Sequence, residues 1–89
     1  MSVRKEYRVN GVDGFIIDYV RQWNGTYKIY ARQHPADPYG RSASYTHLFG
    51  NGQICIASGR EPRSLDAAKT IAGHWMESYS NYTRTGQMR

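Results

Sequence analysis

The residues best suited to chemistry lie in the segment YTHLFGNGQICIASG, residues 45–59, which holds the only cysteine of the chain. Cys55 follows a glycine turn, and His47 precedes it by eight residues. A reactive cysteine needs a base, an amide-rich turn or a helix N-terminus nearby, because these favour the thiolate. We therefore take Cys55 as a candidate nucleophile and His47 as its candidate catalytic partner.

The opposite interpretation of Cys55 is a structural one. Free cysteine is among the most buried residue types, and the string ICI is typical of a sheet core. From the residues alone, burial is the more frequent outcome. In a strand the side chains alternate, so Cys55 is expected to face opposite to Ile54 and Ile56. Which of the two faces the rest of the chain covers decides between a reactive thiol and a core side chain.

A metal site is not expected. The three histidines and Cys55 lack spacings such as C-x-x-C or H-x-x-x-H, which zinc sites use. His74 and Glu77 are three residues apart on one helical face, where such pairs usually face solvent. We expect no metal and no other cofactor.

A second candidate site comes from aromatic and basic residues that interleave in the central part of the chain. On a sheet surface such side chains can stack on bases, or they can form the core of a protein interface. The expected binding residues are Arg21, Trp23, Tyr27, Lys28, Tyr30 and Arg32, with Tyr19 in the same hairpin. The alternative is that half of these rings pack beneath a helix.

The first half of the chain has the pattern of β-strands, which would position these residues. Residues 6–9 end at the turn dipeptide Asn10-Gly11, and Asp13-Gly14 marks a further possible turn. Residues 15–23 and 26–33 flank Asn24-Gly25, a strong hairpin signal because both turn positions favour positive φ. After a loop at 34–44, residues 44–49 and 53–58 are expected to form another strand pair around the GNG turn.

The last third of the chain has helical periodicity. Apolar residues recur every three or four positions from Leu65 to Tyr82, which predicts an amphipathic helix of about five turns. Ser64 is the expected N-cap, and Gly86 the expected stop. The predicted architecture is α+β, a single domain over residues 1–89: an antiparallel meander of four or five strands with one long C-terminal helix packed on one face.

Composition limits the function classes. Twelve basic against seven acidic residues give a net charge of +5, spread over both halves, which indicates a mild bias toward anionic partners. No apolar run exceeds four residues, so a membrane partner is not expected. A single cysteine forms no internal disulfide, and no secretory signal pattern opens the chain, so we expect a cytoplasmic protein.

The C-terminal half resembles the ubiquitin-conjugating-enzyme-like proteins of bacterial anti-phage and ubiquitin-like operons. The strings HLFGNGQICI and AAKTIAGHWMESYSNYTRTG carry the resemblance, which extends over residues 45–86. It implies a meander sheet packed on a helix, a Cys55 that accepts a protein C-terminus as a thioester, and a His47 that shapes the site. The complete His-Pro-Asn motif of eukaryotic members is not present, so the resemblance assigns no oxyanion-stabilising asparagine.

Two functions therefore stand side by side. The first is a small ubiquitin-conjugating-enzyme-like protein that forms a thioester on Cys55. The second is a non-enzymatic binding module, such as a phage or mobile-element regulator, that docks through the aromatic-basic sheet face. A protein is the first expected partner, with a nucleic acid and a second copy of the chain as further candidates.

Overall fold

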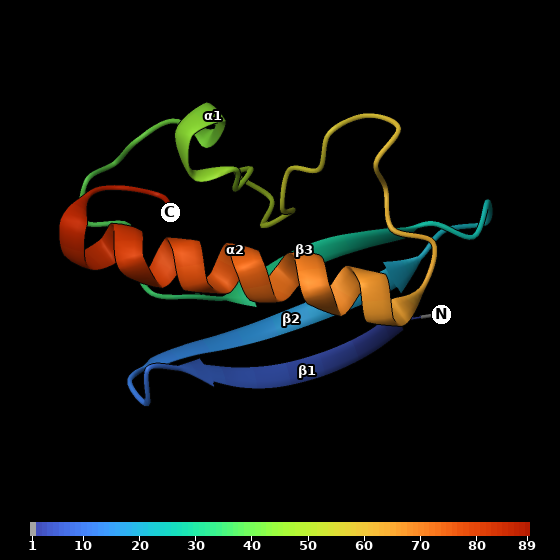
Figure 1. Ribbon diagram of the computed structural model, residues 1–89, viewed down its shortest axis with the longest axis horizontal. Coiled ribbons are helices and arrows are strands. Elements are labelled where there is room, and N and C mark those ends of the chain that lie inside the picture. Colours follow the sequence, from blue (N-terminus) through green and yellow to red (C-terminus); the bar gives the residue numbers. More distant parts are fainter. Residues whose placement is uncertain (1) are drawn as a thin grey trace.

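The computed structural model describes residues 2–89 as a three-stranded antiparallel sheet with one long helix lying across one of its faces (Figure 1). The expected α+β class and the long C-terminal helix are confirmed, whereas the expected four or five strands are not, because the sheet has three in the order β1-β2-β3. The elements are β1 (Ser2–Val9), β2 (Asp13–Arg21), β3 (Tyr27–Gln33), the single-turn helix α1 (Ala43–Thr46) and α2 (Leu65–Thr85).

The two hairpin turns follow the glycine signals of the sequence. Asn10 and Gly11 both take positive φ, at 55° and 69°, and connect β1 to β2. Asp13 and Gly14 form no further turn, since they begin β2 and pair with the end of β1. In the second turn only Gly25 takes positive φ, at 87°, while the side chain of Asn24 accepts hydrogen bonds from Thr26.

The strand pair expected at 44–49 and 53–58 does not form. Its first half instead contains α1, which ends at His47 in the left-handed conformation (φ 58°). The second half pairs only through isolated bridges, Leu48 with Ile54 and Tyr30 with Gln53. The backbone groups of residues 52–54 are satisfied by β3: Ala31 donates its N–H to Gly52 at 2.7 Å, and Ile54 donates to Ile29 at 2.8 Å. This segment therefore covers the outer edge of β3 as a loop.

Helix α2 begins and ends where its capping residues predict. The Ser64 hydroxyl accepts the N–H of Ala67 at 3.1 Å, and Gly86 takes a positive φ of 82° and donates to the Tyr82 carbonyl. These bonds satisfy backbone groups that a helix end leaves without partners. No helix within residues 2–89 is long and apolar enough to cross a membrane.

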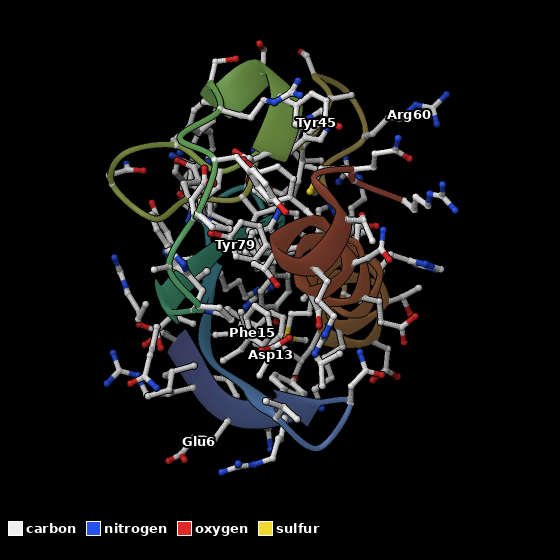
Figure 2. All side chains as sticks on the ribbon, turned by 90° about the vertical axis from the view of Figure 1, so that its left-hand side faces the viewer. Glu6, Asp13, Phe15, Tyr45, Arg60 and Tyr79 are labelled. Atoms are coloured by element: carbon white, nitrogen blue, oxygen red, sulfur yellow. The ribbon has the colours of Figure 1, made fainter. Side chains whose placement is uncertain are left out.

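The core fills the space between α2 and the sheet. Figure 2 shows Phe15 of β2 and Tyr79 of α2 facing one another there, with their ring centroids 6.4 Å apart in an edge-on arrangement. The buried side chains alternate along the strands and recur at helical spacing on α2, as the sequence pattern requires. They are Phe15, Ile17, Tyr19, Ile29, Ala31, Ile54, Ala68, Ala72, Trp75, Met76, Tyr79 and Tyr82.

Two hydrogen bonds fasten α1 to α2 and to the C-cap of α2. The buried indole N–H of Trp75 donates to the Thr46 carbonyl at 2.9 Å, and the hydroxyl of Tyr45 donates to the Gly86 carbonyl at 2.9 Å. Because α1 is one turn long, its position depends on these tertiary contacts. They fix the point from which the chain enters the segment that carries His47 and Cys55.

Candidate functional site around Cys55

The side chain of Cys55 is exposed, while its two isoleucine neighbours are held by the core. Ile54 is only 2% exposed and belongs to the core cluster, and Ile56 is half-buried against that cluster. The two isoleucines thus fix the backbone on either side of the cysteine. The thiol faces solvent on a segment anchored from both sides.

His47 lies next to Cys55 through the backbone. The N–H of Cys55 donates to the carbonyl of His47 at 2.8 Å, beside the Leu48–Ile54 bridge. The chain reverses between them in the turn at residues 49–53, where Phe49 donates its N–H to Gln53 at 2.9 Å and Gly52 donates to Phe49 at 2.9 Å. The structure describes no hydrogen bond between the imidazole and the thiol, so the contact between the two residues is a main-chain one.

A shallow, mainly apolar depression of about 300 Å³ adjoins Cys55 on the side of α2. Ile54, Ile71 and Trp75 form part of its wall, and His47 and His74 both line it. The sequence pattern placed His74 only in a pair with Glu77. Because His74 directly precedes the buried Trp75, the sequence could have placed it at the edge of the buried face of the helix. This edge meets the cysteine segment.

A second groove, of about 390 Å³, adjoins Cys55 on the side of the β2–β3 turn. Trp23 and Phe49 line it and are large apolar side chains left 98% and 43% exposed. Lys28, Glu61 and Arg63 add charges of both signs. Cys55 lines both the depression and the groove, and so lies where the two meet.

The residues expected to form one aromatic-basic face do not share a face. Tyr19 is fully buried, and burial together with a 2.7 Å hydroxyl contact to Tyr7 raises its pKa. Tyr27 packs partly against the core, and Arg21 is its cross-strand partner on the side of α2. The other members lie elsewhere: Lys28, Tyr30 and Arg32 on or next to the opposite face, and Trp23 in the turn.

An ion cluster that sequence reasoning missed occupies the sheet face opposite α2. Asp18 accepts hydrogen bonds from Arg4 Nε and Nη2 at 2.7 and 2.9 Å, and from Arg32 Nε at 3.0 Å. These guanidinium groups, Arg4 first, lower the pKa of Asp18 to about 2 against the opposing effect of burial. In a hairpin centred on Gly11, residue 4 pairs with residue 18, so the sequence alone could have predicted that Arg4 lies opposite Asp18.

Comparison with models of protein families, with curated proteins and with solved structures found no match to this chain. The function is therefore argued from the geometry of the site.

Proposed function

We propose that the protein carries an acyl group as a thioester on Cys55 and transfers it to an amine. The observation that carries the proposal is the exposed thiol at the junction of two hollows, on a backbone fixed by Ile54 and Ile56. A nucleophile must be accessible yet held in place, because a positioned group lowers the entropic cost of reaching the transition state.

The chemistry is an exchange at a carbonyl carbon. The Cys55 thiolate attacks the activated C-terminal carboxyl group of a small protein, the S–C bond forms, and the activating group leaves with the bonding electron pair. In the second step an amine attacks the thioester, the N–C bond forms, and the Cys55 thiolate departs. The proton that the amine loses is taken up by a base, and His47 and His74 are the imidazoles that line the adjoining depression.

The resemblance to ubiquitin-conjugating-enzyme-like proteins supports the same reaction. It implies a cysteine near a helix that packs on a meander sheet, and here α2 packs on a three-stranded sheet, with the cysteine segment along the outer edge of β3 and lining a depression with α2. Within this proposal the main-chain carbonyl of His47 positions Cys55 by accepting its N–H, while the His47 imidazole is one of the two bases that line the depression.

Reaction with a peptide thioester that ends in Gly-Gly tests the proposal directly. We expect a Cys55 adduct, seen by intact-protein mass spectrometry and removed by a reducing thiol, to form faster on the folded chain than on the chain in urea. Cys55→Ala should form none. His47→Ala should slow the transfer to an added amine. His74→Ala removes the other imidazole of the same depression and is the variant for comparison. A rate equal to that of the unfolded chain would refute an organised site.

A second candidate function is protein binding through the groove beside the β2–β3 turn. It is favoured by Trp23, whose ring is almost fully exposed and which lines the same groove as the exposed Phe49. Tryptophan is enriched among the residues that dominate binding energy in protein interfaces. Under this function Trp23→Ala abolishes capture of the partner while Cys55→Ser leaves it intact. Loss of capture with Cys55→Ser alone would exclude it.

A further inference from the structure

We propose that the sheet face opposite α2 binds single-stranded nucleic acid. We call this surface the open face, because no helix among residues 2–89 covers it (Figures 1 and 2). Cys55 lies on the far side of β3 from β1, and of the open-face residues only Lys28 also lines the groove beside it. The charged and aromatic side chains of the open face are Arg4, Glu6, Arg8, Asp18, Lys28, Tyr30 and Arg32.

The open face carries a net positive charge. It carries four basic side chains and two acidic ones, and Asp18 is already bound by Arg4 and Arg32. Its carboxylate therefore serves to hold two guanidinium groups over the middle of the sheet. Arg8 and Lys28 make no ion pair with any residue that the structure describes. Glu6 is the remaining acid, and Figure 2 shows it pointing away from the core.

The cations form a diagonal stripe across the three strands. Arg8 of β1 lies opposite Gly14, and Lys28 of β3 lies opposite Val20. Gly14 and Val20 are six positions apart on β2, which corresponds to roughly 20 Å of strand. The guanidinium groups around Asp18 lie between the two ends. A stripe of this length suits a few consecutive phosphates of one strand, because single-strand sites begin at about four nucleotides.

A stacking platform lies near the Lys28 end of the stripe. The Arg32 guanidinium lies 4.3 Å from the centroid of the Tyr30 ring, and its Nε is held by Asp18. Unpaired bases stack on aromatic rings and on guanidinium planes, whereas a duplex buries the faces of its bases between neighbouring pairs. Phosphate contacts at Arg8 and Lys28 with stacking at Tyr30 and Arg32 therefore favour a single strand over a duplex.

Fluorescence anisotropy with a labelled oligothymidine of about 12 nucleotides tests the proposal at low salt. The double variant Arg8→Ala/Lys28→Ala should bind at least about tenfold more weakly. Since each single-strand phosphate contact contributes about 0.7 to the slope of log K against log salt, two lost contacts should reduce that slope by about 1.4. Glu6→Gln should bind more tightly than the wild type.

The matched control removes the same charge elsewhere. Arg60→Ala/Lys69→Ala changes the loop before α2, where Arg60 projects away from the sheet (Figure 2), and α2 itself. It should leave affinity and slope within twofold of the wild type, and Cys55→Ala should do the same even if the thioester proposal fails. Equal losses in both double variants, equal affinity for a duplex of the same length, equal affinity for a polyglutamate of the same charge, or no binding at all would each overturn the proposal.

Discussion

At the scale of single residues, Asp18 joins all three strands of the sheet. It is 8% exposed and accepts three hydrogen bonds from two guanidinium groups that come from the strands on either side. A buried carboxylate is tolerated only when it is paired in this way. The residue thus links β1 to β3 across β2, although those two strands do not contact one another in the sheet.

Stability should consequently depend on pH through Asp18. Its folded pKa of about 2 lies below the usual value near 4, so its contribution is present above pH 4 and is lost as the pH falls toward 2. Asp18→Asn should reduce the free energy of unfolding at neutral pH by about 1.5–3 kcal/mol, the range for hydrogen bonds to charged groups. Urea denaturation of both proteins at pH 7 and at pH 2 measures this. An unchanged difference between them at the two pH values would contradict the assignment.

At the scale of elements, the loop over the edge of β3 depends on one glycine. Gly52 has a φ of 91°, and a Cβ at this position would lie 3.0 Å from the carbonyl oxygen of Ala31. The close approach is required by the hydrogen bond from Ala31 N–H to the Gly52 carbonyl. This loop leads directly into Ile54 and Cys55, so its conformation also sets the position of the thiol.

Gly52→Ala should therefore both destabilise the fold and disturb the cysteine segment. We expect a loss of about 1–3 kcal/mol, because a side chain is strained in this backbone region and must also displace main-chain atoms. Gly50→Ala is the matched control, since it has open space around its Cα and no positive φ. Thermal denaturation and the rate of Cys55 alkylation report the two effects. Equal behaviour of the two variants would show that the loop is not constrained at Gly52.

The same elements show what the sequence can and cannot predict. Helix α2 and the two hairpin turns follow from local signals: the caps at Ser64 and Gly86, and the turn glycines. The expected strand at 44–49 depended on its place before the GNG turn. It was overridden by the bond from Trp75 to Thr46, which joins residues 29 positions apart. The exposure of Cys55 could not be predicted either, because it depends on which face α2 covers.

At the scale of the whole molecule, the sheet, the helix and the connecting loop share one core. Strands β2 and β3, the loop residue Ile54 and α2 all contribute buried side chains to the same cluster. A domain of this size with one core usually unfolds in a single cooperative step. The loop that carries Cys55 should lose its structure together with the helix.

The two tryptophans allow this cooperative unfolding of loop and core to be measured. Trp75 is buried and Trp23 is 98% exposed, so Trp23→Phe leaves a fluorescence signal that comes from the core alone. We expect its urea transition to coincide with that of the helical circular dichroism signal and with that of Cys55 accessibility. A cysteine that becomes reactive at lower urea than the core signal changes would instead identify the loop as a separately unfolding unit.

The two edges of the sheet differ in a way that affects how the molecule can be extended. The backbone of β3 is sealed by residues 52–54 and by Pro62, whose carbonyl accepts the N–H of Tyr27 at 2.9 Å. In the part of the chain that the structure describes, no strand lies beyond β1. The sheet can therefore grow in one direction only. A designer who wishes to graft a further strand, or to fuse a partner by strand pairing, should add it beside β1.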